Sequence, residues 1–309
     1  MTEPPPLPEG FAVGHWSDLA GGTGCTVVVP PPETPGGVCV HGGGPGTRET
    51  DTLGPLANAS EANAILITGG SAFGLAAADG VVRWLEEHER GYFTPFGRVP
   101  LVPAAVIYDL PSGDGNVRPG PEAGYAACEA AAGGVPERGG VGAGTGATVG
   151  KVLGRERAVQ GGLGYAAMIT GTGHTVAAIA VVNAMGDVID ADGSLLAGPR
   201  SDGAAVRSSE LIAEMKEAPE YRVPEGNSTP VCVCTDAALD KRQCSIVARS
   251  ATAGMGRAID PVFTPVDGDV VFCLASGRGK PEQFAPIQIG AAAATVTAAA
   301  IRDAVRQAG

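Results

Sequence analysis

The segment around Ser228 contains the residue types that intramolecular nucleophilic chemistry needs. It reads Gly226-Asn-Ser-Thr-Pro-Val-Cys-Val-Cys-Thr-Asp236 and follows the polar, proline-bearing stretch 218–226. A hydroxyl between an exposed linker and a buried strand can attack the preceding carbonyl, and hydrolysis of the ester leaves a new N-terminus. The freed α-amine, with a pKa of about 7.7–8.0 in model compounds, can then act as base for its own side chain. The same residues also fit an ordinary turn, or a glycosylation sequon at Asn227.

Three better-known motifs are incomplete. Gly150-Lys151 lacks both the earlier glycine and the following hydroxyl residue of a phosphate-binding loop. Gly142-x-Gly144-x-x-Ala147 matches a relaxed dinucleotide pattern, but no clear strand precedes it. His41-Gly-Gly-Gly and Gly70-Ser71 resemble parts of a serine hydrolase, although Phe73 stands where the nucleophile elbow needs glycine. A conventional hydrolase using Ser71 is therefore the weaker alternative.

Composition narrows the class of protein. The 309 residues are 44% hydrophobic and 17% charged, with a net charge of −12. This is a globular composition, and its acidity argues against nucleic acid and anionic membranes as partners. The N-terminus MTEPPPLPEGF lacks the features of a signal peptide, and the 7 cysteines show neither a disulfide framework nor a paired zinc pattern. We expect a cytoplasmic protein with reduced thiols.

Apolar runs and turn signals predict one α/β domain of layered sheets and helices, without repeats. The predicted strands are 25–30, 37–41, 64–68, 101–110, 165–170, 175–184, 229–235 and 270–274. The predicted helices are 71–91, 121–132, 239–259 and 286–308, and 201–218 is compatible with a helix.

Ordered blocks along nearly the whole chain carry a family resemblance. They are Val13–His15, Gly22–Val27, Gly43–Thr50, Gly69–Gly80, Val102–Asp109, Gly142–Lys151, Val182–Asp187 and Gly256–Asp269. Together they resemble the self-processing aminopeptidase family of D-aminopeptidases, β-peptidyl aminopeptidases and 6-aminohexanoate-oligomer (nylon-oligomer) hydrolases. The blocks look most similar to the nylon-oligomer hydrolase branch.

The resemblance implies a single-domain, four-layer αββα sandwich. Cleavage between Asn227 and Ser228 would divide it into chains 1–227 and 228–309, which associate into a homo-oligomer such as a tetramer of cleaved heterodimers. The resemblance also implies a hydrolase of small amide or peptide substrates that works through an acyl-serine without cofactor or metal. An aminopeptidase of short or non-standard peptides, an acyltransferase of the ornithine acetyltransferase type, and an uncut, inactive scaffold are the alternatives.

The resemblance also suggests roles for individual residues, each of which has a local structural explanation as well. Ser228 falls on the nucleophile and Asn183 on an oxyanion donor. Lys151 could lower the pKa of the new amine or orient the nucleophile, and Asp267 and Asp269 could orient the lysine or the amine. Tyr108 could donate to the tetrahedral intermediate, and the backbone amides of 69–71 could lie near the site. The family pattern Asn-Thr-Thr-Ile is here Asn-Ser-Thr-Pro, and Pro230 removes an amide donor near the strand start.

Overall fold

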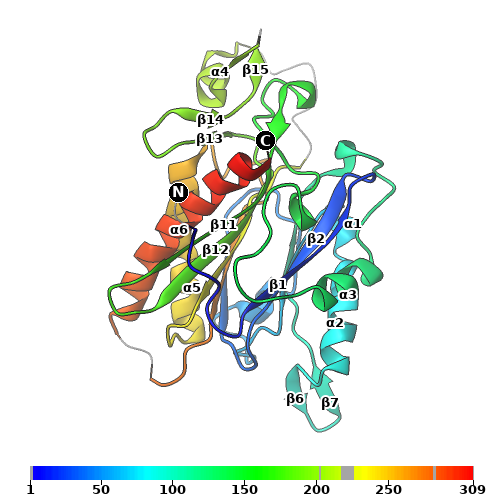
Figure 1. The fold of residues 1–309 in the computed structure, drawn as a ribbon, viewed down its shortest axis with the longest axis vertical. Helices are drawn as coiled ribbons and strands as arrows, with labels where there is room; N and C mark the ends of the chain where they lie inside the picture. The colour runs from blue at the N-terminus through cyan, green and yellow to red at the C-terminus, as the bar shows by residue number, and fades with distance from the viewer. Residues whose placement is uncertain (1–2, 202, 217–225, 281–282, 309) are drawn as a thin grey trace.

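Two five-stranded sheets lie at the centre of the molecule (Figure 1). The computed structural model describes residues 3–201, 203–216, 226–280 and 283–308. The first sheet, in spatial order, contains β1 (Ala12–Asp18), β2 (Thr23–Val29), β5 (Ile65–Thr68), β8 (Ala104–Val106) and β4 (Thr47–Arg48). The second contains β11 (Gly162–Ile169), β12 (Thr175–Val182), β17 (Pro230–Thr235), β19 (Val270–Ala275) and β3 (Gly36–Val40).

The three central strands of the second sheet, β12, β17 and β19, are buried on both faces. Along β12, Val176 and Ala178 pack into the apolar cluster that contains α5 (Lys241–Ala258) and α6 (Ala285–Ala308). The alternate residues of β12, such as Ile179, pack into the cluster between the two sheets. Because successive side chains point to opposite faces, a strand covered on both sides reads as a continuous apolar run.

Helices close both outer faces of the sheet pair. α2 (Ala77–Glu87) and α3 (Pro121–Glu129) share an apolar cluster with the first sheet, on the side away from α5 and α6 (Figure 1). Small residues allow close helix contacts: a Cβ on Gly254 of α5 would lie 2.2 Å from Ala294 O of α6. The order helix, sheet, sheet, helix confirms the predicted αββα sandwich.

Shorter elements complete the chain. They are α1 (Ser71–Gly74), α4 (Ser208–Glu214), β6 (Tyr92–Thr94), β7 (Gly97–Val99), β9 (Thr148–Val149), β10 (Val159–Gln160), β13 (Asp187–Ile189), β14 (Leu195–Ala197), β15 (Arg200–Ser201), β16 (Ala204–Ala205) and β18 (Ile259–Asp260). Single turns of 3₁₀ helix cover Thr50–Leu53, Leu110–Ser112, Gly142–Gly144 and Arg155–Arg157.

Several predicted boundaries differ from the structure. The predicted strand 101–110 is regular only over β8, because a 3₁₀ turn with Pro111 ends the extended segment. The helix predicted from Ser71 is two helices, α1 and α2. Within the described part of the helix-compatible segment 201–218, the helix covers 208–214. The sequence did not predict β1, and the proposed linker lies outside the described residues except for Gly226.

The sheet topology brings several strand ends together. β12 and β17 are antiparallel, so the C-terminal end of β12 meets the N-terminal end of β17. β17 and β19 are parallel, so their N-terminal ends are neighbours. Ser228 and Asp269 precede β17 and β19, whereas Asn183 follows β12. Residues far apart in sequence therefore converge at one edge of the second sheet.

Candidate active site

Ser228 lies just before β17 and is held by its neighbour strand. Its backbone nitrogen donates to Asn183 O at 3.0 Å, and Asn183 N donates to Ser228 O at 3.1 Å. Ser228 is only 4% exposed. Its Oγ donates a hydrogen bond to the carbonyl oxygen of Asn227 at 2.6 Å. The hydroxyl is thus next to the carbonyl group that a self-cleavage reaction would attack.

Lys151 is buried beside this pair. It follows β9 after Gly150, whose φ of 71° lies in the left-handed region that glycine tolerates. Lys151 Nζ donates to Asn183 O at 2.9 Å and to Asn183 Oδ1 at 2.8 Å. Burial lowers the pKa of Lys151 well below its ordinary value, and the charge of Arg155 lowers it further, while Asp267 and Asp269 oppose the shift.

Both carboxylates of the Asp267-Gly-Asp269 turn are buried and hydrogen-bonded. Asp267 accepts from Met185 N at 3.3 Å, and from the backbone nitrogen and hydroxyl of Thr264. Asp269 accepts from Thr229 N at 2.7 Å and from Phe263 N at 3.2 Å. Burial, and then the neighbouring Asp267 charge, raise the pKa of Asp269 to about 7. The turn is therefore a rigid acidic support next to the start of β17.

Tyr108 reaches the site from the other sheet. Its backbone oxygen accepts a hydrogen bond from Asn183 Nδ2 at 3.3 Å. Its ring packs on Gly226, where an added Cβ would lie 2.3 Å from Tyr108 Cβ. The structure thus brings all six predicted site residues into one connected cluster, although the Asn183 amide points to Tyr108 rather than to Asn227 O.

Sequence comparison relates the chain that carries this cluster to known proteins. The model of Peptidase family S58 matches residues 9–309. The chain belongs to peptidase family S58. It is 42% identical to an uncharacterized aminopeptidase of Mycobacterium tuberculosis, with 94% of this chain and 90% of the relative covered. It is 30% identical to the 6-aminohexanoate-oligomer endohydrolase of an Agromyces species, with 86% and 73% covered. These relatives support a peptide or amide hydrolase.

Solved structures share the fold of this chain. A Burkholderia β-aminopeptidase superposes with a TM-score of 0.70 at 23% identity, covering 96% of this chain and 84% of the other. The L-aminopeptidase D-Ala-esterase/amidase of Ochrobactrum anthropi, described as a variant of the Ntn hydrolase fold, superposes with a TM-score of 0.71 at 19% identity, covering 97% of this chain and 85% of the other.

The turn at 69–71 is fixed by hydrogen bonds within the fold. The backbone amides of 69–71 are already used within the fold, because Gly69 N donates to Gly24 O, Gly70 N to Asp109 Oδ1 and Ser71 N to Ile107 O. They do not point at Asn227. Asp109, which is not among the residues predicted from the sequence, also accepts from Thr23 Oγ1 at 2.7 Å and fixes this turn beside Tyr108.

The alternative serine hydrolase has no assembled triad in the described part of the chain. The exposed His41 donates through its backbone to Asp269 O, and its ring lies 4.2 Å from that of Phe263. No hydrogen bond or ring contact joins it to Ser71 within the described ranges. His41 is thus close to the Ser228 cluster in space but belongs to its surrounding loop.

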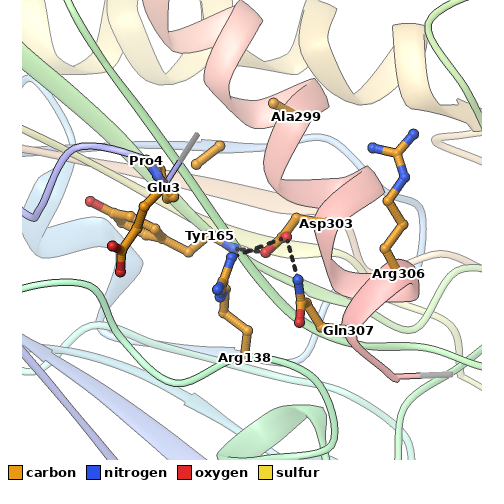
Figure 2. A pocket seen from close by; sticks show the side chains of 9 residues that line it. Glu3, Pro4, Arg138, Tyr165, Ala299, Asp303, Arg306 and Gln307 are labelled. Atoms are coloured by element: carbon orange, nitrogen blue, oxygen red, sulfur yellow. Dashed lines mark hydrogen bonds and ion pairs between the residues drawn. The ribbon is translucent and has the colours of Figure 1, made fainter. Parts of the chain in front are cut away.

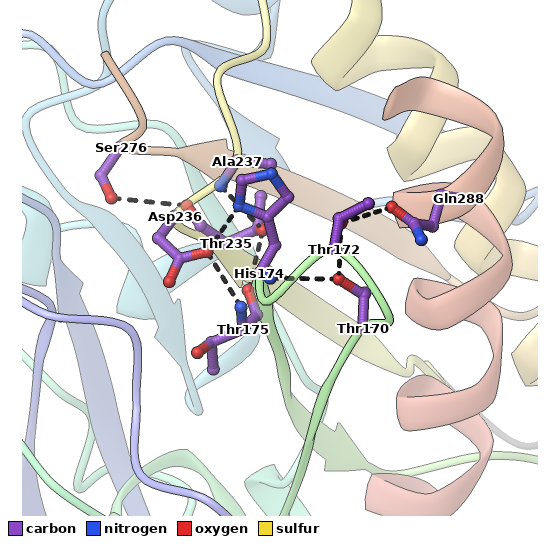
Figure 3. A network of polar contacts seen from close by, with 9 residues as sticks. All are labelled: Thr170, Thr172, His174, Thr175, Thr235, Asp236, Ala237, Ser276 and Gln288. Atoms are coloured by element: carbon purple, nitrogen blue, oxygen red, sulfur yellow. Dashed lines mark hydrogen bonds and ion pairs between the residues drawn. The ribbon is translucent and has the colours of Figure 1, made fainter. Parts of the chain in front are cut away.

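Two other polar regions of this S58 protein lie away from the cluster. A pocket of about 470 Å³ lies beside Tyr165, and Figure 2 shows Arg138 and Asp303 paired in its lining. In Figure 3, His174 lies 3.4 Å from Asp236 at the end of β17 opposite Ser228. Neither region includes a predicted site residue.

Two further features concern metals and membranes. No cluster of three or more metal-ligating side chains occurs among the described residues. Within the same ranges, every helix is too short or too polar for a bilayer span.

Proposed function

We propose that this protein cuts itself between Asn227 and Ser228 and then hydrolyses amide bonds of small substrates through an ester on Ser228. One observation carries the proposal: Ser228 Oγ donates to Asn227 O at 2.6 Å, on a buried segment held between β12 and the 267–269 turn. A hydroxyl in this position needs little movement to reach the adjacent carbonyl carbon.

Self-cleavage is a balanced intramolecular step followed by hydrolysis. The Oγ–C bond to Asn227 forms, the C–N bond breaks, and the hydroxyl proton ends on the Ser228 nitrogen. Water then cleaves the ester and leaves an Asn227 carboxylate and a free Ser228 hydroxyl. Lys151 is the proposed proton carrier, since burial lowers its pKa. In later turnovers the new α-amine is the base, and Asp267 and Asp269 orient the amine and the lysine.

The proposed substrate is a short or non-standard peptide, or an oligomer of 6-aminohexanoate. Relatives named as aminopeptidases share more identity with this chain than those named as 6-aminohexanoate-oligomer endohydrolases, at 42% against 30%. This difference favours an aminopeptidase. We also propose a cytoplasmic homo-oligomer, and the 7 free cysteines are consistent with a reducing compartment.

Intact-mass analysis with N-terminal sequencing tests self-cleavage. We expect fragments 1–227 and 228–309, the second beginning Ser-Thr-Pro-Val. Ser228→Ala should stay whole and inactive, and Ser228→Cys should retain cutting because a thiol can also attack. If only the full-length chain is found after long incubation, self-cleavage is contradicted. If a fragment begins at another residue, the assignment of Ser228 is contradicted.

Thr229→Val is a matched control for Ser228→Ala. Thr229 is fully buried, and its hydroxyl has no hydrogen-bond partner within the described residues. Replacing it by a methyl group of similar shape should leave cleavage unchanged.

A separate assay distinguishes hydrolysis from acyl transfer. A hydrolase forms product from the amide substrate with water as the only acceptor, whereas a transferase needs an added amine acceptor.

A further inference from the structure

The carbonyl oxygen of Asn227 has a second donor besides the Ser228 hydroxyl. Gly268 N donates to Asn227 O at 2.5 Å, across a parallel bridge between Asn227 and Asp267. When Ser228 Oγ attacks the carbonyl carbon, it becomes bonded to that carbon and no longer donates to the oxygen. The Gly268 N–H remains aimed at the atom on which negative charge develops.

The Gly268 peptide is held firmly on both sides. Asp267 O accepts from Gly44 N at 2.8 Å, and Asp269 O accepts from His41 N at 2.9 Å. The two aspartate side chains are fixed by the hydrogen bonds described above. A donor that is already oriented needs no reorganisation as charge develops, which is the condition for strong electrostatic stabilisation.

Glycine at 268 is required by space. Its φ lies outside the left-handed region that favours glycine. A Cβ at this position would lie 2.6 Å from Ser228 Oγ and 2.8 Å from Gly44 O. Any side chain would therefore displace the hydroxyl. Because Gly268 has no side chain, the 267–269 turn can lie against Ser228 Oγ while Gly268 N donates to Asn227 O.

We propose that the backbone N–H of Gly268 is the oxyanion donor for self-cleavage at Asn227, a catalytic group presented by the Asp267-Gly-Asp269 turn. This inference rests on the proposed function. Asp267 and Asp269 act as positioning residues for the donor. The Gly268 N–H stabilises the negative charge on Asn227 O in the tetrahedral intermediate, in which the Oγ–C bond has formed and the C–N bond is still intact. That charge disappears when the C–N bond breaks.

An ester substitution removes this donor without adding a side chain. Glycolic acid is placed at position 268 of the full chain by nonsense suppression, and cleavage is followed by intact mass. We expect cleavage to slow by about 10²–10³-fold, the usual effect of losing one oxyanion donor. The control is glycolic acid at Gly173, whose N–H donates to Thr170 O at 2.9 Å in the turn at the opposite end of β12.

The outcomes separate the two proposals. If wild type and the Gly173 ester cut normally and the Gly268 ester cuts equally fast, the Gly268 inference is overturned and self-cleavage stands. If wild type does not cut, both are overturned. Should the Gly268 ester fail to fold, NMR of uncut Ser228→Ala decides: a scalar coupling across the hydrogen bond between Gly268 N and the Asn227 carbonyl carbon is expected, and its absence overturns the inference.

Discussion

Lys151 Nζ donates two hydrogen bonds to Asn183, one to its backbone oxygen at 2.9 Å and one to its side-chain oxygen at 2.8 Å. The backbone of Asn183 in turn pairs with Ser228. A buried amine is therefore tied to the residue that holds the proposed nucleophile. Because burial lowers its pKa, the lysine can accept a proton near neutral pH more readily than an exposed lysine can.

We expect Lys151→Met to remain folded and to slow self-cleavage by about 10²-fold or more, because loss of a proton-transfer group typically costs about 10²–10⁴ in rate. Methionine keeps the length of the side chain and removes a buried amine. The cleaved fraction is measured against time, with the thermal transition as the folding check. Lys280→Met, at an exposed position, is the control. Wild-type cleavage by Lys151→Met would leave the lysine with only a structural role.

Asn183 can be tested with two variants. In Asn183→Asp, a carboxylate near Lys151 Nζ should raise the pKa of the lysine and move the rise of the cleavage rate to higher pH. Asn183→Ala removes an amide without adding charge, so its profile should not move in that direction. If Asn183 is also the oxyanion donor during turnover, kcat of fully cut Asn183→Ala should fall by about 10²–10³-fold. A wild-type kcat would assign Asn183 to positioning alone.

Elements buried on both faces could be predicted from the sequence. β12, β17 and β19 are continuous apolar runs, and each was predicted to within a few residues. β1 was missed because it is an edge strand whose half-exposed segment includes His15 and Trp16, so it shows neither a continuous run nor a clean alternation.

The site could be predicted only in part. Family blocks point to Ser228 and its partners, but their order in sequence says nothing about distances. Asp109 is 86 residues from Thr23 and 39 from Gly70, and only the folded chain joins them. The proposed role of Gly268 likewise depends on the close approach of the turn to Ser228 Oγ, which cannot be read from a sequence pattern.

The raised pKa of Asp269 predicts how the free energy of unfolding depends on pH. Its pKa rises from 3.8 to about 7 on folding. Between these values the folded chain keeps a proton that the unfolded chain has lost, so the free energy of unfolding should fall as pH rises through this window and level off above it. A tenfold change in the affinity for a proton corresponds to about 1.4 kcal/mol, so the total effect is on the order of a few kcal/mol.

The measurement compares urea unfolding of Ser228→Ala with that of Ser228→Ala/Asp269→Asn from pH 4 to 8, so that every chain is uncut. Asp187, whose pKa burial raises to about 6, contributes the same sign in both proteins and cancels in the difference. The stability of the parent relative to the Asn variant should fall up to about pH 7. A pH-independent difference would contradict a raised pKa for Asp269.

Pro230 interrupts the ladder between β12 and β17. Ser228 lies opposite Asn183, and Val231 opposite Ala180, so the register places Pro230 opposite Val181. Ser228 and Asn183 exchange both backbone hydrogen bonds. In an antiparallel pair, hydrogen-bonded positions alternate, so the next one is at Pro230, where the N–H is missing.

Pro230→Ile should therefore restore a donor toward Val181, raise the free energy of unfolding of uncut Ser228→Ala by about 1 kcal/mol, and speed cleavage in the Ser228 background. The faster reaction follows because Ser228, two residues earlier, would be held by a continuous ladder. Pro230 is buried, so the larger isoleucine could also strain its surroundings. Pro230→Ala separates these effects, since it restores the N–H without added bulk. If Ala speeds cleavage and Ile does not, packing opposes the restored bond. If neither variant cuts faster than wild type, the bond to Asn183 already orders Ser228 fully and the proline has no influence on the reaction.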